Sequence, residues 1–143
     1  MSELYANAPS TVDLIVENEN GILLVKRKNH PFKGHWALPG GFLDCGKESL
    51  EEAAVRELKE ETSLYANIED MVLIGVYSDP KRDPRGHIIS HAYHVKMSHG
   101  QLKADDDAAE AMIFPRDSLP RDLAFDHDKI LQDYFDYRRK YGK

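Results

Sequence analysis

The chain has little cysteine and lacks any long apolar run. Its 143 residues include one cysteine, so an internal disulfide is impossible and we expect a reducing compartment. No apolar stretch approaches the roughly 18 to 20 residues that a membrane helix needs. The first ten residues, MSELYANAPS, have neither the basic nor the apolar region of a secretory signal. We therefore predict a cytoplasmic protein that has no membrane partner.

An excess of positive charge is also missing. The formal net charge of -6 argues against a nucleic-acid partner, because binding to a phosphate backbone depends on clustered Lys and Arg. It does not exclude a small phosphate-bearing molecule, which binds locally through a metal ion and a few cations. With 41% hydrophobic and 31% charged residues, the composition is that of a globular chain, and the length predicts one domain over residues 1–143.

Glutamate is abundant in one segment. Residues 38–64 read LPGGFLDCGKESLEEAAVRELKEETSL, a glycine turn followed by a predicted helix over about 48–61. At about 100° per residue, Glu57 and Glu61 fall on the apolar stripe of that helix, where a surface helix would not place them. Like charges one turn apart repel each other, so we expect a positive group between these two carboxylates.

The rest of the chain predicts strands around this helix and one further helix. Alternating polar and apolar residues favour a half-buried strand over 11–17, followed by a turn and a second strand over 22–25. The other predicted elements are strands over 71–77, 87–97 and 111–114 and a closing helix from about Asp126. This order predicts one α/β domain in which helices enclose a sheet.

The glutamate-rich segment resembles the box of the Nudix hydrolase superfamily. The places of that box are filled by Glu48, Arg56, Glu57, Leu58, Glu60, Glu61 and Leu64. Two positions depart from it: six residues instead of five separate Gly41 from Glu48, and Ser63 replaces a glycine. We expect the extra residue to lengthen only the turn near Gly46, and Ser63 to close the helix differently from glycine. The resemblance implies a Nudix-like α/β/α sandwich with a mixed β-sheet between helices.

Carboxylates at this spacing suit a hard cation. Glu57 and Glu61 can reach the same ion, Glu60 lies beside them, and Mg²⁺ prefers such oxygen ligands, with Mn²⁺ able to substitute. The resemblance adds the Gly40 carbonyl as a ligand and gives Arg56 the task of holding the glutamates in place. It also implies a catalytic base. That base is either a glutamate of the box or a later acidic residue, and the later candidates are Asp105, Asp106, Asp107 and Glu110.

Three further stretches, WALPGGF, SDPKRDPRGH and LAFDH, resemble the ADP-ribose pyrophosphatase branch of the superfamily. The resemblance implies a substrate, ADP-ribose, and two products, AMP and ribose 5-phosphate. Gly41 would then let the diphosphate approach closely, and Arg82 or Arg85 would bind a phosphate or the terminal ribose. The candidates for stacking on adenine are Phe32, Trp36 and Tyr77, although Trp36 is better suited to a core or hinge position.

Several alternatives stay open. One is a nucleoside triphosphate pyrophosphohydrolase with the same fold, and another is a sensor that binds ADP-ribose without hydrolysing it. The branch often forms dimers in which both chains shape the site, so a homodimer is a further possibility. A zinc site at His87, His91 and His94 is disfavoured because their spacing matches no zinc motif. His127 is interpreted as structural.

Overall fold

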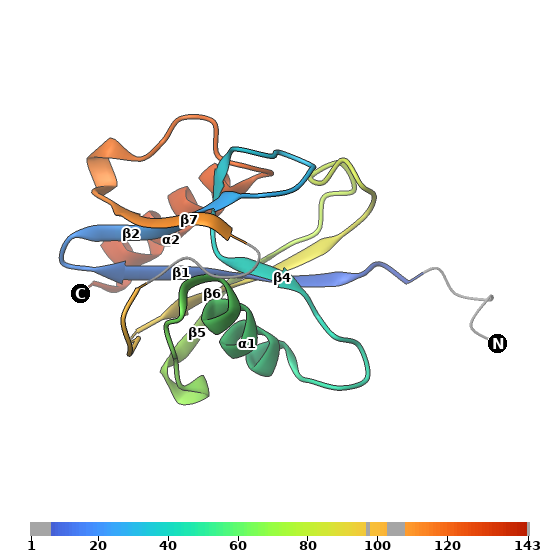
Figure 1. Cartoon of the computed structure of the whole chain (residues 1–143), viewed down its shortest axis with the longest axis horizontal. Coiled ribbons are helices and arrows are strands. Elements are labelled where there is room, and N and C mark those ends of the chain that lie inside the picture. Colours follow the sequence, from blue (N-terminus) through green and yellow to red (C-terminus); the bar gives the residue numbers. More distant parts are fainter. Residues whose placement is uncertain (1–6, 97, 103–107, 143) are drawn as a thin grey trace.

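The computed structural model describes residues 7–96, 98–102 and 108–142. Within these residues, the regular structure comprises seven strands and two α-helices, and Figure 1 shows how they are arranged. The strands are β1 (Ser10–Asn18), β2 (Gly21–Arg27), β3 (Trp36–Ala37), β4 (Gly40–Phe42), β5 (Met71–Tyr77), β6 (Ile89–Val95) and β7 (Ala108–Phe114). The helices are α1 (Leu50–Thr62) and α2 (His127–Tyr141), with short 3₁₀ turns η2 (Ile68–Asp70) and η3 (Arg116–Ser118).

The strands form one mixed sheet in the order β3-β2-β1-β6-β5, with β4 paired to β1 and β7 paired to β2. β1 and β6 run parallel, with Leu14 opposite Tyr93, whereas the other strand pairs are antiparallel. In Figure 1, α1 lies in front of the sheet and α2 lies behind it. The predicted α/β/α sandwich is therefore confirmed.

Alternate residues of the central strand β1 serve two separate cores. Leu14 joins the buried cluster that includes Leu58 of α1, whereas Ile15 joins the cluster that includes Ile130 of α2. This is the expected result of a strand whose side chains point to opposite faces in turn. The sequence pattern predicted a half-buried strand, but Thr11 and Asp13 are buried as well, so both faces of β1 are covered.

α1 begins and ends with defined caps. Ser49 and Glu52 form a reciprocal capping box, in which each side chain accepts a hydrogen bond from the backbone N–H of the other residue. At the other end Ser63 adopts the left-handed conformation, with φ of 66°, and donates its backbone N–H to Lys59 O at 2.9 Å. The expectation that Ser63 would close the helix differently from glycine is wrong. Serine takes the glycine conformation at a cost of about 1 kcal/mol.

The extra residue before α1 lies in an exposed turn. Gly46 has φ of 83°, Lys47 N donates to Asp44 O at 3.1 Å, and Asp44 N donates to Glu48 Oε2 at 2.9 Å. Glu57 and Glu61 of α1 are still buried, so the longer turn does not rotate them toward solvent. The two glycines that were predicted to form a turn belong to a strand instead. Gly40 and Gly41 lie in β4 and pair with β1.

The other predicted elements are present with shifted bounds. β6 is shorter than the predicted strand over 87–97, and β7 begins three residues before the predicted strand over 111–114. α2 begins at His127, one residue after its predicted start, and buries Ile130, Leu131 and Tyr134 against the sheet. Neither helix of the described residues is long and apolar enough to cross a membrane.

Candidate functional site

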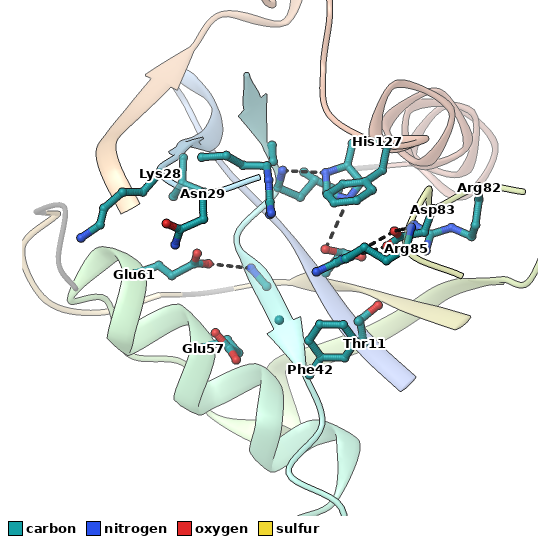
Figure 2. A pocket seen from close by; sticks show the side chains of 18 residues that line it. Thr11, Lys28, Asn29, Phe42, Glu57, Glu61, Arg82, Asp83, Arg85 and His127 are labelled. Atoms are coloured by element: carbon teal, nitrogen blue, oxygen red, sulfur yellow. Dashed lines mark hydrogen bonds and ion pairs between the residues drawn. The ribbon is translucent and has the colours of Figure 1, made fainter. Parts of the chain in front are cut away.

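The two glutamates on the apolar stripe of α1 are buried against β4. Glu57 and Glu61 are each 8% exposed and point from the helix toward the cavity shown in Figure 2. A Cβ atom at Gly41 would lie 2.3 Å from Glu57 Oε2, so only glycine at this position leaves room for that carboxylate. Gly40 donates its backbone N–H to Glu61 Oε1 at 2.7 Å, which orients the second carboxylate.

Arg56 binds three glutamates from outside the cavity. Its Nε and Nη2 donate to the two carboxylate oxygens of Glu48 at 2.9 and 2.6 Å, and its Nη1 donates to Glu57 at 3.0 Å and Glu60 at 3.3 Å. The hydrogen bonds from Arg56 lower the pKa of Glu48 to about 2. Arg56 therefore contacts glutamates before and within the helix, whereas Glu52 caps the helix.

The glutamates form one wall of a cavity of about 310 Å³. Its other walls come from β1, β2, β4, the loop after β5 and the start of α2. The lining residues are Thr11, Asp13, Val25, Arg27, Lys28, Asn29, Ala37, Leu38, Gly40, Gly41, Phe42, Glu57, Glu61, Arg82, Asp83, Arg85, Phe125 and His127.

Two arginines and two phenyl rings form another part of the lining. Arg85 lies over the rings of Phe42 and Phe125, at 4.9 and 5.3 Å from their centroids, and donates two hydrogen bonds to Asp83. Arg27 also lies over Phe125, at 4.9 Å. Burial, and then repulsion by Arg85, lowers the pKa of Arg27 below its ordinary value. Two cations on one ring repel each other, so an anion in the cavity would stabilise both.

Arg27 has N–H groups to spare for such an anion. Within the described residues, the one hydrogen bond of its side chain runs from Nε to Pro31 O at 2.7 Å. Arg82, by contrast, is held by Asp126, to which it donates two hydrogen bonds of 2.9 and 2.6 Å, and by Ile88 O. Its side chain is 4% exposed. The Arg82 guanidinium is therefore engaged by the protein itself and mainly supports the wall of the cavity.

A buried polar pair lies deeper in the cavity. Asp13 accepts a short hydrogen bond from the Ser90 hydroxyl, and its Oδ1 lies 3.4 Å from His127 Nε2. Burial alone would raise the pKa of Asp13, but His127, Ser90 and Arg82 together outweigh burial, so this pKa lies below its ordinary value. Asp13 is therefore a carboxylate at neutral pH. His127 is buried and also faces the cavity, and its interpretation as structural stays a prediction.

Several residues predicted for the site lie away from this lining. Trp36 packs edge to face on Phe114 beside the core on the α2 side. Tyr77 donates its hydroxyl to Asp133 at 2.8 Å in a separate depression over β5 and α2. Phe32 packs on Phe125 and reaches the cavity only through that ring. The role of Phe32, Trp36 and Tyr77 in stacking on adenine stays a prediction that their positions do not support.

The candidate acidic residues are also spread out. Glu60 turns toward Arg56 and is not among the lining residues. Glu110 lies on β7 with Lys26 Nζ 3.8 Å from its carboxylate, likewise outside the lining. Asp106 and Asp107, with Asp105, lie outside the described residues. The choice of catalytic base therefore stays a prediction.

Among the lining residues that sequence reasoning did not select for the site are Asp13, Arg27, Asp83, Phe125 and His127. Phe125 and His127 belong to the LAFDH stretch already noted, so that stretch held a signal. Phe125 and Phe32 both adopt left-handed backbone conformations, with φ of 53° and 62°. Such strain costs about 1 kcal/mol per residue and is characteristic of functional sites. Only the folded structure reveals it.

The fold and the site together define an α/β/α sandwich protein with a cavity for a charged ligand. Buried carboxylates form one wall, and arginines stacked on phenyl rings form another. The family follows from comparison with known sequences. The chain belongs to the NUDIX domain family, whose model matches residues 8–134.

Individual relatives agree with this assignment. A protein from Methanocaldococcus jannaschii named ADP-ribose pyrophosphatase is 54% identical over 135 residues, which cover 94% of this chain and 78% of that protein. The ADPR responsive transcriptional repressor NtrR of Acinetobacter baylyi is 33% identical, and the match covers 92% of this chain and 54% of the repressor. The NUDIX domain of Shewanella oneidensis NrtR, solved in complex with ADP ribose, superposes with a TM-score of 0.84 at 29% identity. That superposition covers 96% of this chain and 92% of that one.

Proposed function

We propose that the chain hydrolyses the diphosphate of ADP-ribose and depends on a divalent metal ion. A water molecule attacks one phosphorus atom and the bridging P–O bond breaks, which leaves one phosphate on AMP and one on ribose 5-phosphate. The observation that carries the proposal is the pairing, in one cavity, of two buried glutamates with Arg27 and Arg85. The relative named ADP-ribose pyrophosphatase supports the choice of substrate.

The site residues fit a hard divalent cation. Enzymes of this family generally depend on one. In the described residues no group of three or more His, Cys, Asp or Glu side chains is arranged as a complete metal site. That result agrees with Mg²⁺ or Mn²⁺, which typically take one or two protein carboxylates and complete their coordination with water and substrate phosphates. The close approach of the Glu57 carboxylate to Gly41, where a Cβ atom would lie 2.3 Å from Oε2, supports such a site.

We assign the metal ligands as Glu57, Glu61 and the Gly40 carbonyl, with Glu60 as a further candidate. When bound, the metal supplies Lewis acidity toward water and phosphate oxygens. The chain itself positions the carboxylates through Arg56 and the Gly40 N–H.

The basic groups of the cavity would hold the substrate. Arg27 and Arg85 present N–H groups to its phosphates, because an arginine donates parallel hydrogen bonds to phosphate oxygens. Asp13, an acceptor at neutral pH, suits ribose hydroxyls better than a third phosphate. This arrangement favours a nucleoside diphosphate linked to a sugar over a nucleoside triphosphate.

The test is turnover of ADP-ribose in Mg²⁺, with products identified by chromatography. Glu61→Gln should abolish AMP formation without changing the thermal unfolding temperature by more than a few degrees. Glu69→Gln is the matched control, because it makes the same chemical change at an exposed position away from the cavity. Normal turnover in a folded Glu61→Gln variant would refute the mechanism.

Two further assays distinguish this function from the two alternatives. Pyrophosphate release from a panel of nucleoside triphosphates, with no reaction of ADP-ribose, would indicate a triphosphate pyrophosphohydrolase. Calorimetric binding of ADP-ribose with no AMP formed in Mg²⁺ would indicate a sensor, a possibility suggested by the likeness to a named ADPR-responsive repressor. The cytoplasmic location, the single domain over 1–143 and the homodimer stay predictions.

A further inference from the structure

His127 connects the start of α2 to the strand segment that carries the glycine pair. The ring is 3% exposed, and its Nδ1 accepts the backbone N–H of Leu38 at 3.0 Å. A ring nitrogen that accepts a hydrogen bond carries no proton, so the neutral ring holds its proton on Nε2. That nitrogen faces Asp13 Oδ1 at 3.4 Å. The tautomer of His127 is therefore set by its two neighbours.

Short contacts fix the segment from Leu38 to Gly40 on every side. Its first N–H is held by His127, and the Pro39 carbonyl accepts from Leu14 N at 2.8 Å. The last residue, Gly40, packs so tightly on β1 that a Cβ atom would lie 2.0 Å from the Val12 carbonyl oxygen. The N–H of this same glycine donates to Glu61 at 2.7 Å. A single rigid peptide segment thus joins the histidine to the glutamate.

We propose that His127 is a positioning residue for Glu61. By holding Leu38, it fixes the register of the segment and aims the Gly40 N–H at the carboxylate that binds the metal. The inference rests on the metal site of the proposed function. Its alternative is a histidine that only fills the core, through its ring contact with Phe125 at 5.4 Å.

Two substitutions separate these roles, because each one retains the hydrogen bond of one ring nitrogen and removes that of the other. In His127→Asn, the amide oxygen takes the place of Nδ1 and still accepts from Leu38, while the link to Asp13 is lost. In His127→Gln, the longer amide takes the place of Nε2 and keeps the link to Asp13, while the acceptor for Leu38 is lost. A residue that only filled space would give two similar variants.

The first measurement is Mn²⁺ affinity in the absence of substrate, by calorimetry. We expect His127→Asn to bind within about threefold of the wild type and His127→Gln to bind on the order of tenfold more weakly, as the loss of one buried hydrogen bond implies. The matched control is His91→Gln, since the His91 ring also bonds a backbone group, Thr11 O at 3.1 Å, but lies outside the cavity. His91→Gln should leave Mn²⁺ affinity unchanged.

The second measurement follows the backbone directly, by amide hydrogen exchange of the metal-free, ¹⁵N-labelled protein. The Leu38 amide should exchange faster in His127→Gln than in the wild type, and the Gly40 amide resonance should shift. His127→Asn should resemble the wild type in both respects. This readout does not depend on metal or substrate.

Each result decides the inference. Equal Mn²⁺ affinity in His127→Gln and the wild type would overturn it while leaving the proposed function intact. A wild-type protein that binds no Mn²⁺ would overturn the proposed metal site and this inference together. Should His127→Gln fail to fold, His127→Leu replaces it, because leucine fills the space and accepts no hydrogen bond from Leu38: Mn²⁺ affinity about tenfold below that of His127→Asn supports the inference, and equal affinity in the two variants refutes it.

Discussion

Gly41→Ala tests whether the space beside Glu57 serves the reaction. The backbone at Gly41 is not in the left-handed region, so alanine is conformationally allowed and the whole effect is steric. The added Cβ would meet the Glu57 carboxylate at 2.3 Å, and Cβ contacts below 3.0 Å essentially never occur. The carboxylate must therefore withdraw by about 0.7 Å. It cannot swing freely, because Arg56 Nη1 holds its Oε2 at 3.0 Å.

A displacement of this size at a reacting centre lowers turnover on the order of 10-fold to 100-fold. The crowding also destabilises the fold by about 1 to 3 kcal/mol. The assay is kcat for ADP-ribose in saturating Mg²⁺, together with Mn²⁺ affinity and a thermal unfolding curve. The control is Gly75→Ala on β5, where the three atoms nearest to the added Cβ belong to the Tyr77 side chain, at 3.2 Å or more.

A double mutant shows whether the steric reason is right. Glu57→Asp shortens the side chain and withdraws the carboxylate from the added methyl group, although it is itself expected to impair turnover. Gly41→Ala should then cost little more when Glu57→Asp is already present, so the two effects will not add. Full additivity, or normal turnover in a folded Gly41→Ala variant, would refute the reasoning.

Three further predictions concern stability. Ser63→Gly should raise the free energy of unfolding by about 0.5 to 1 kcal/mol in guanidinium unfolding, because glycine adopts the left-handed cap of α1 without strain. Glu48→Gln should cost about 1 kcal/mol at neutral pH. Since hydrogen bonds from Arg56 lower the pKa of Glu48 from 4.5 to about 2, the stabilisation is present above 4.5, so the difference from the wild type should vanish as pH falls through about 2. Asp126→Asn, which leaves the charge of buried Arg82 without a full partner, should cost roughly 3 kcal/mol in urea unfolding, and a loss below 1 kcal/mol would contradict the pairing.

Local sequence patterns predicted those structural features that depend only on residues close together in the chain. The wheel of α1 placed Glu57 and Glu61 on one face, because helical periodicity fixes that relation whatever surrounds the helix. The alternation in β1 likewise predicted a strand. The pattern did not show that Asp13 is buried, because its covering partner His127 lies more than a hundred residues further along the chain. Pairs of this kind are set by the tertiary fold and leave no local signal.

The basic loop after β5 shows the same limit. Arg82 and Arg85 look equivalent in the sequence, yet Arg82 is bound by Asp126 and Arg85 lies over two phenyl rings. Ser63 shows a different limit. Propensity disfavours serine in the left-handed region by about 1 kcal/mol, and the packing of the following Leu64 into the core outweighs it.

The cavity takes residues from Thr11 on the first strand to His127 on the last helix. During synthesis the ribosome releases the first strand and the glutamate helix well before the last helix emerges. A nascent chain that stops short of that helix lacks the link from His127 to Leu38, although it already carries Glu57 and Glu61. Full ligand affinity thus requires residues as far as His127, and a rise of metal affinity in timed translation experiments would report the moment at which α2 docks.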